Sequence, residues 1–365
     1  MKWSLLSLVP LFAPLLTASP VHDVRAAPVD LPRLIVYFQT THDSRTGRPI
    51  SMLPLINEKG IALTHLIVCS LHINRDSVVH LNDYPPSDPR FYTLWNETVS
   101  MKNAGVKVMG MVGGAAAGSF DSTTLDGDED TFEKYYGQLR DVIKNFGLEG
   151  MDLDVEQRMS QAGITRLVSH LRKDFGTDFT ITLAPVASAL FNGGNLSGFD
   201  YKTLQETNGD DIAFYNAQFY SGFGSMSSPR DYRRAVSNGF SPSKVVAGQL
   251  TSPSNGYGYI PYEKLNATVI SLRDDYGQIG GVMGWEYFNS KPGDTAEPWK
   301  WAQIMTEILR PNSVPDMKIT KPDADRLQQA YEDSLQHILG GALSGIGDLL
   351  DSLTDAIDYQ SMVNA

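Results

Sequence analysis

The stretch LEGMDLDVE, residues 148–156, alternates acidic and apolar side chains, and the interpretation of the whole chain starts from it. Asp152, Asp154 and Glu156 occupy every second position, with one apolar residue between each pair. Successive residues of a β-strand point to opposite faces, so a strand here places the three carboxylates together on one face. We therefore expect a strand with helices packed on its apolar face and a row of carboxylates on the other.

Seven other short runs of β-branched and apolar residues occur along the chain, and helical patterns follow most of them. These runs lie at 33–40, 63–71, 107–114, 179–186, 212–220, 244–250 and 280–288. Strands that alternate with helices indicate a parallel sheet, and eight such units match an α/β fold of the closed (β/α)8 type, the TIM barrel. An open doubly wound sheet is the alternative, but no Gly-rich dinucleotide fingerprint follows the first run.

The two ends of the chain differ in amino-acid composition and pattern from the repeating strand and helix units. Residues 1–19 combine an early lysine, an apolar stretch and small residues, a pattern that predicts a signal peptide, and 20–27 follow as a possible pro-segment. Residues 28–315 are expected to form the single catalytic barrel. The acidic segment 316–365 carries Leu and Ile at helical spacing, which predicts a loosely attached or removable helical tail.

Composition limits the class of protein and its partners. The formal net charge of -12 and the pI near 5.0 disfavour nucleic acid and anionic membranes as partners. Three sequons, at Asn96, Asn195 and Asn266, agree with a secreted, extracellular glycoprotein. The single cysteine, Cys69, cannot form an internal disulfide, and its apolar surroundings predict a core position. We expect a secreted monomer whose stability rests on its core.

Carboxylates on one inward face of a barrel strand are suited to acid–base chemistry. Active sites of this fold lie at the carboxyl ends of the strands, so Glu156, the last of the row, is expected nearest the substrate. Clustered carboxylates cannot all ionise in a medium of low dielectric, and at least one pKa must rise. A carboxyl group that keeps its proton near neutral pH is what a general acid requires.

Three other interpretations of the row compete with this one. A calcium loop is disfavoured because Gln157 stands where such a loop requires Gly. The two aspartates offer oxygen ligands that suit Mg²⁺ or Mn²⁺. A satisfied structural network is the third, because inward carboxylates require many hydrogen-bond donors. The acid–base interpretation implies no metal or other cofactor.

The run EGMDLDVE resembles the strand-four signature Asp-Gly-x-Asp-x-Asp-x-Glu of glycoside hydrolase family 18, which includes chitinases and endo-β-N-acetylglucosaminidases. Glu149 replaces the first Asp of that signature, and Met111 replaces the Ser of the strand-three motif in MVGG. The runs QFYSGFGSM and GGVMGWEYFNS are similar to those of secreted fungal endo-β-N-acetylglucosaminidases. The resemblance covers roughly residues 30–315 and implies the same barrel.

The resemblance also implies roles for individual residues. Glu156 would protonate the glycosidic oxygen, and Asp154 would hold the substrate's 2-acetamido group, which attacks the anomeric carbon to give an oxazolinium ion. Asp152 would tune Asp154. Tyr220 would donate a hydrogen bond to the acetamido oxygen, and Trp285 would form the apolar wall beside its methyl group.

Several further residues are candidates for the site. Gln218 belongs to the strand-six motif of the resemblance, and Tyr37 lies in the first strand. Gln249 ends the seventh run. His65 and His72 flank the second run, but no second His or Cys stands at zinc spacing, which favours structural roles.

Three functions remain open from the sequence. The first is cleavage of the β-1,4 bond between the two core GlcNAc residues of N-glycans, which the resemblance favours. The second is hydrolysis of chitin, and the third is a non-catalytic sugar-binding barrel, which the presence of Glu156 disfavours. The loops at 41–49, 114–130 and 251–261 are rich in Gly, Ser, Asp and Asn, which suits polyhydroxylated branches better than a flat polymer. Tyr257 and Tyr259 are the exceptions.

Overall fold

Eight parallel strands close into a barrel in the computed structural model, which describes residues 31–311 and 325–333. The parallel strands are β1 Arg33–Phe38, β2 His65–His72, β4 Lys107–Gly114, β5 Gly150–Val155, β6 Thr180–Leu183, β7 Phe214–Gln218, β8 Val245–Leu250 and β9 Gly281–Trp285. The sheet closes because β1 pairs with β9 on one side and with β2 on the other. The predicted (β/α)8 barrel is thereby confirmed, and the open-sheet alternative is wrong.

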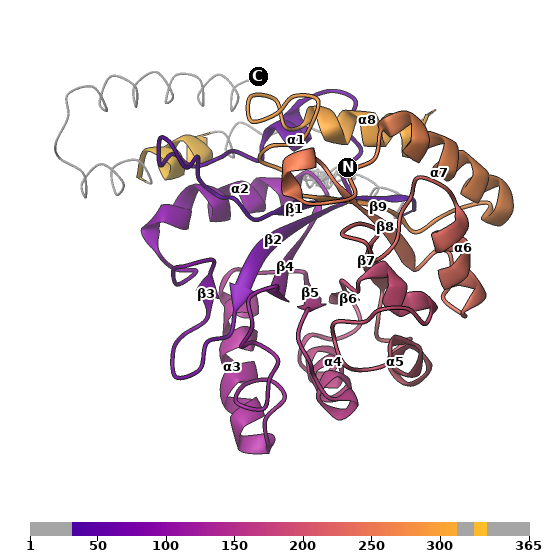
Figure 1. Ribbon diagram of the computed structural model, residues 1–365. Helices are drawn as coiled ribbons and strands as arrows, with labels where there is room; N and C mark the ends of the chain where they lie inside the picture. The colour runs from indigo at the N-terminus through magenta and orange to yellow at the C-terminus, as the bar shows by residue number, and fades with distance from the viewer. Residues whose placement is uncertain (1–30, 312–324, 334–365) are drawn as a thin grey trace, which may run out of the picture.

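Helices surround the barrel on its outside (Figure 1). They are α1 Pro54–Asn57, α2 Tyr92–Asn103, α3 Glu129–Asn145, α4 Gln161–Phe175, α5 Tyr201–Asn208, α6 Arg230–Ser237, α7 Tyr262–Tyr276 and α8 Lys300–Leu309. A two-residue strand that the sequence did not predict, β3 at His80–Leu81, pairs antiparallel with the end of β2. This hairpin builds up one side of the barrel mouth.

Side-chain caps mark where several of these helices begin. Asp128, Ser160 and Asp200 precede α3, α4 and α5, and each accepts a hydrogen bond from the backbone N–H three residues later, at 3.0, 2.9 and 2.6 Å. Such caps satisfy one of the free N–H groups of the first turn and contribute about 1 kcal/mol each. Local sequence therefore sets the start of the helices that flank β5 and β6.

The alternation in β5 separates two layers of the core. Met151, Leu153 and Val155 pack with the surrounding helices in the larger, outer layer. Asp152 and Asp154 are buried on the opposite face, toward the barrel interior. The smaller, inner layer consists of Ile35, Tyr37, Ile67, Cys69, Met109, Met111, Phe214, Tyr220, Val246, Leu250 and Met283.

Part of the predicted tail packs against the barrel. Residues 325–333 form a helix, drawn in yellow beside α2 in Figure 1, and Leu327 and Tyr331 belong to the outer core layer. Arg326 donates hydrogen bonds to the backbone oxygen and Oδ1 of Asn96 at 2.6 and 3.0 Å, and to Oγ of Ser100 at 2.7 Å. This helix therefore contributes to the packing of the barrel, rather than hanging free from it.

We expect Leu327→Ala to destabilise the fold by about 2–4 kcal/mol, because it removes a fully buried leucine side chain. The barrel interior should keep its structure at 25 °C, since α2 lies outside the barrel. Denaturant unfolding measures the effect, and Gln329→Ala, an exposed position of the same helix, is the matched control. Equal stability of the two variants would show that the helix does not dock in solution.

Several sequence predictions concern the surface or the ends of the chain. The predicted signal peptide 1–19, the possible pro-segment 20–27 and most of the segment 316–365 lie outside the described residues. Asn195 and Asn266 are exposed, whereas Asn96 is half-buried beneath Arg326, and glycosylation of all three stays a prediction. Within 31–311 and 325–333, no helix has both the length and the apolarity needed to cross a membrane.

Candidate active site

The carboxylate row descends from the barrel mouth into its interior. Glu156 follows the last residue of β5 and is half-buried, Asp154 is 5% exposed, and Asp152 is completely buried. The strand therefore arranges the three carboxylates in order of depth, as the alternation predicted. A substrate entering at the carboxyl ends of the strands would meet Glu156 before the two aspartates.

Asp152 is held by three neutral side chains from three other strands. Its Oδ2 accepts a hydrogen bond from the Tyr37 hydroxyl at 2.5 Å, and its Oδ1 accepts from Thr182 Oγ1 at 2.5 Å and Asn216 Nδ2 at 3.1 Å. Burial raises the pKa of Asp152, and these hydrogen bonds oppose that rise because they favour the ionised form. The interpretation as a structural network thus describes Asp152 well. Both carboxylate oxygens of Asp152 already accept hydrogen bonds, which argues against a divalent metal at this residue.

Gln218 links the two upper carboxylates. Its Nε2 lies 3.2 Å from Oδ1 of Asp154, 3.1 Å from Oε1 of Glu156 and 3.0 Å from the backbone oxygen of Ala184. Burial, then the nearby charges of Glu156 and Asp152, raises the pKa of Asp154 well above its usual range. Of the two aspartates, Asp154 is therefore the one whose ionisation the site opposes more strongly.

A cavity of about 340 Å³ lies over the row, with Asp154, Glu156 and Gln218 in its wall. Tyr220 and Trp285 also line it, and Trp285 packs edge-on against Tyr37 with 5.6 Å between ring centroids. Burial and the charges of Asp154 and Glu156 raise the pKa of Tyr220, so its hydroxyl stays protonated and can donate a hydrogen bond. The cavity thus combines carboxylates, side-chain amides, a phenol and an apolar indole wall.

Gln249 is the sequence candidate that the structure does not bring to this group. It follows Ala247 on the face of β8 that packs toward the helices, while Val246 and Leu250 point inward. Its Nε2 donates to the backbone oxygen of Gly248 at 2.6 Å. The alternation of the strand, which placed Asp152 and Asp154 correctly, places Gln249 on the wrong face for this cavity.

The two histidines of the second strand differ in position. His65 begins β2, is buried, and packs edge-on against Phe214 at 5.2 Å between ring centroids. Burial, with Arg33 and Lys107 nearby, lowers its pKa to about 3, so it is neutral and structural. His72 ends β2 and lines the cavity over the carboxylates.

The two departures from the family signature have visible consequences. Glu149 lies just before β5, and its Oε2 accepts from the backbone N–H of Val108 at 2.9 Å, at the end of the strand opposite to Glu156. Met111 pairs in register with Asp152 and fills the inner core. Met111 has no side-chain donor, and the hydrogen bonds to Asp152 come from Tyr37, Thr182 and Asn216.

Gly113, in the MVGG run, is required by close packing beside the row. Its φ is +105°, and an added Cβ would lie 2.3 Å from the backbone oxygen of Asp154 and 2.4 Å from the ring of Phe120. Only glycine adopts this backbone conformation readily and fits this space. Any side chain there would displace Asp154 from its position.

Sequence reasoning missed three inward residues, Thr182, Asn216 and Gln39. Thr182 and Asn216 bind Asp152, and Gln39 lines the cavity. Gln39 and Asn216 stand two residues after the inward Tyr37 and Phe214, and Thr182 lies between the outward Ile181 and Leu183. The same alternation that identified Asp154 could therefore have found them.

Removal of the charge from Asp154 should change how stability depends on pH. A carboxyl group whose pKa is raised by folding contributes stability below its unfolded pKa of about 3.9, and that contribution is lost as pH rises through the folded value. We therefore expect Asp154→Asn to be more stable than the wild type at about pH 7.5, by about 1.4 kcal/mol per unit of pKa shift, with little difference at about pH 4. Thermal unfolding at both pH values tests this, and parallel pH profiles would contradict it.

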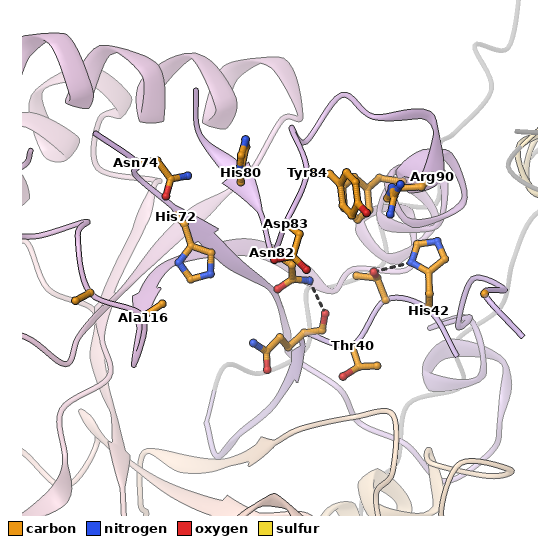
Figure 2. Close-up of a pocket in the computed structure, with 15 residues that line it drawn as sticks. Thr40, His42, His72, Asn74, His80, Asn82, Asp83, Tyr84, Arg90 and Ala116 are labelled. Carbon is orange, nitrogen blue, oxygen red and sulfur yellow. Dashed lines mark hydrogen bonds between the residues drawn. The ribbon is translucent and has the colours of Figure 1, made fainter. Parts of the chain in front are cut away.

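A larger cavity of about 1090 Å³ adjoins the first one and shares Gln39, His72 and Ala116 with it. Figure 2 shows its side chains, which are predominantly polar. Many come from the segment after β2, which sequence reasoning did not implicate, including Asn74, His80, Asn82, Asp83 and Tyr84. The loops after β1 and β4 also contribute, as expected.

A third cavity, of about 860 Å³, shares Phe223 with the first one. The loop after β8 lines it with Tyr257 and Tyr259, together with Arg230 and Arg234 of α6. The small cavity over the carboxylates thus adjoins two larger ones. Such an arrangement suits an extended ligand that passes through the small cavity.

A row of carboxylates at the carboxyl end of a (β/α)8 barrel, beside a cavity with tyrosine and tryptophan walls, suits a hydrolase of glycosidic bonds. Residues 33–251, more than half of the chain, match Glycosyl hydrolases family 18. The chain belongs to this family of carbohydrate-acting hydrolases.

The chain is also similar to solved structures and to curated proteins. The chain is 72% identical to a fungal endo-β-N-acetylglucosaminidase of family 18, with a TM-score of 0.77 over 78% of this chain and 100% of that one. It is 48% identical to a chitinase from Aspergillus fumigatus, with a TM-score of 0.69 over 75% of this chain and 98% of that one. Endochitinase 4 of Metarhizium anisopliae is 22% identical over 53% of this chain and 74% of its own length.

Proposed function

We propose that the protein is a secreted endo-β-N-acetylglucosaminidase that hydrolyses the β-1,4 bond between the two core GlcNAc residues of N-glycans. The observation that carries this proposal is the 72% identity to a fungal endo-β-N-acetylglucosaminidase over the whole of that chain. The signal-peptide pattern of residues 1–19 supports secretion. A chitinase is the second candidate, because the Aspergillus fumigatus chitinase is 48% identical.

Glu156 is the proposed general acid. It is the carboxyl group of the row nearest the mouth, and it lines the small cavity where the scissile bond would lie. It would protonate the glycosidic oxygen as the bond to the anomeric carbon breaks, and it would later take a proton from the water that opens the intermediate. Gln218 orients its carboxylate through the 3.1 Å hydrogen bond.

The nucleophile in this proposal is the carbonyl oxygen of the substrate's own 2-acetamido group. Its attack on the anomeric carbon forms an oxazolinium ion, and water then opens that ring with retention of configuration. Asp154 would hold the acetamido N–H and balance the positive charge, Asp152 would orient and tune Asp154, and Tyr220 would donate to the acetamido oxygen. Trp285 would contact the methyl group. Asp154, Tyr220 and Trp285 line one small cavity and Asp152 lies deeper on the same face of β5, which supports this arrangement.

The shape of the mouth supports N-glycan over polymeric chitin. The 1090 Å³ cavity is about three times the size of the 340 Å³ cavity, so it has room for several sugars where the small one has room for one. Its wall offers His, Asn, Asp and Thr side chains, and the ring of Tyr84 is covered by the guanidinium of Arg90 at 3.1 Å. Hydrogen bonds to branched hydroxyls suit this wall better than stacking of a flat polymer.

Two incubations of the purified enzyme test the function. One uses a high-mannose glycoprotein of the ribonuclease type, and the other uses chitin oligomers. We expect release of glycans that leaves a single GlcNAc on asparagine, read by mass spectrometry, and weak or no cleavage of chitin oligomers. A Glu156→Gln preparation run in parallel excludes contaminating activity. Ready cleavage of chitin oligomers with untouched glycoprotein would establish the chitinase alternative, and binding of either sugar without cleavage would indicate a sugar-binding barrel.

A further inference from the structure

Gln39 stands where the small cavity meets the large polar one. It follows β1, two residues after the inward-facing Tyr37, and it lines both cavities. Within residues 31–311 and 325–333, the side-chain amide of Gln39 has no hydrogen-bond partner, and the residue is half-buried. An amide offers two donors and one acceptor oxygen, which suits adjacent sugar hydroxyls.

The backbone of Gln39 is held from both sides. Its N–H donates to Oε2 of Glu286 at 3.1 Å, and its carbonyl accepts from Nδ2 of Asn82 at 3.0 Å, the contact drawn as a dashed line from Asn82 in Figure 2. Asn82 in turn accepts from the backbone N–H of Ser70 at 3.2 Å. The free amide of Gln39 thus projects from a fixed backbone, so little ordering is required when it binds a ligand.

Glu286 connects three loops at the mouth. Its carboxylate accepts from the N–H and Oγ1 of Thr40, both at 2.8 Å, in addition to Gln39. Its backbone oxygen accepts from Thr251 Oγ1 at 2.6 Å, after β8, and from Ser290 Oγ at 2.9 Å, after β9. A buried carboxylate is costly to fold unless donors surround it, and here all of its donors come from the loop after β1.

Glu286 does not line the small cavity, although it directly follows Trp285. Both of its carboxylate oxygens are occupied by the donors of Gln39 and Thr40. These contacts leave it no chemical step to perform. They make it a positioning residue for the loop that carries Gln39.

Resting on the proposed function, we propose that the amide of Gln39 binds hydroxyl groups of the sugar that leads from the small cavity into the large polar one, and that Glu286 positions it. In an N-glycan this sugar is the first mannose next to the cleaved GlcNAc pair. Because Gln39 lies at the junction, it contacts the ligand irrespective of how the outer branches are arranged.

The test measures ligand binding without turnover, by calorimetry in the Glu156→Gln background. The probes are a high-mannose glycopeptide, a chitin oligomer and free GlcNAc. Gln39→Ala should weaken the glycopeptide about tenfold, as expected for lost neutral hydrogen bonds, and leave free GlcNAc unchanged. Gln329→Ala, exposed on the helix at 325–333, is the control without effect.

Variants of Glu286 separate positioning from simple stability. Glu286→Gln is isosteric, and its amide can donate to Thr40 Oγ1 while its oxygen still accepts the backbone N–H groups, so it should bind within about threefold of the parent. Glu286→Ala should weaken the glycopeptide as much as Gln39→Ala does. Should Glu286→Ala fail to fold, the affinities of Gln39→Ala and Glu286→Gln for the glycopeptide still test the proposal.

The outcomes distinguish this inference from the proposed function. If the parent binds chitin oligomers and not the glycopeptide, the proposed function fails, and the Gln39 comparison is then made on the oligomer. Equal affinity of Gln39→Ala and its parent for whichever ligand binds would overturn the inference. An equal loss for free GlcNAc would also overturn it, since it would place Gln39 in the small cavity alone.

Discussion

The Glu156→Gln protein is expected to lose hydrolysis of the N-glycan by at least about 10²–10⁴-fold while it keeps its fold. Glutamine has the size of glutamate, and its Oε1 can still accept the hydrogen bond that Gln218 gives at 3.1 Å. What it cannot do is transfer a proton to the departing sugar oxygen. Initial rates of glycan release measure the loss, and circular dichroism and thermal unfolding confirm the fold.

Glu149→Gln is the matched control for this variant. It makes the same chemical change just before β5, where Glu149 accepts from Val108 at the opposite end of the strand. This variant should hydrolyse the substrate at a rate near that of the wild type. Substantial turnover by a folded Glu156→Gln protein, or equal loss in both variants, would refute the assignment of Glu156.

The Asp154→Asn protein is expected to lose hydrolysis by about 10²–10³-fold, yet to keep transfer from a sugar oxazoline to a GlcNAc acceptor. Asp154 lies one step deeper than Glu156 on the same face of β5, close to Tyr220 and Trp285 in the same cavity. In the proposed mechanism it holds the acetamido group while the ring closes. An oxazoline arrives with that ring already formed, so it no longer requires this step.

Both reactions are followed by mass spectrometry on the same preparation. Asp178→Asn, at an exposed position between α4 and β6, controls for the change of charge and should leave both rates unchanged. Loss of hydrolysis and transfer in equal measure would count against the role of Asp154 and would indicate a general disturbance of the site.

The local pattern of apolar and polar residues in the sequence was enough to predict the barrel and the carboxylate row. Period-two alternation placed Asp152, Asp154 and Glu156 on one face because strand geometry alone decides that outcome. Alternation of strands with helices predicted the parallel sheet, and the sheet is a closed barrel of eight parallel strands. The family resemblance added Gln218, Tyr220 and Trp285, which the structure gathers around the same cavity.

Partners that are distant in the sequence could be decided only by the tertiary structure. Asp152 is bound by Tyr37, Thr182 and Asn216, which are 115, 30 and 64 residues away, and closure of the barrel is what brings them within 3.1 Å. The same closure pairs Glu286 with the loop after β1, across 247 residues. No local period encodes such contacts.

The sequence by itself therefore determined that strands alternate with helices and which face of β5 carries the carboxylates, and it predicts Glu156 as the acid. The tertiary structure decided which neighbours hold each carboxylate, that Gln249 lies away from the cavity, and that the helix at 325–333 packs on α2. It also joined the segment after β2 to the mouth, where it lines the large polar cavity. The physical reason is that side-chain direction follows from the local backbone, whereas burial, desolvation and hydrogen-bond partners depend on which strands the closed sheet places side by side.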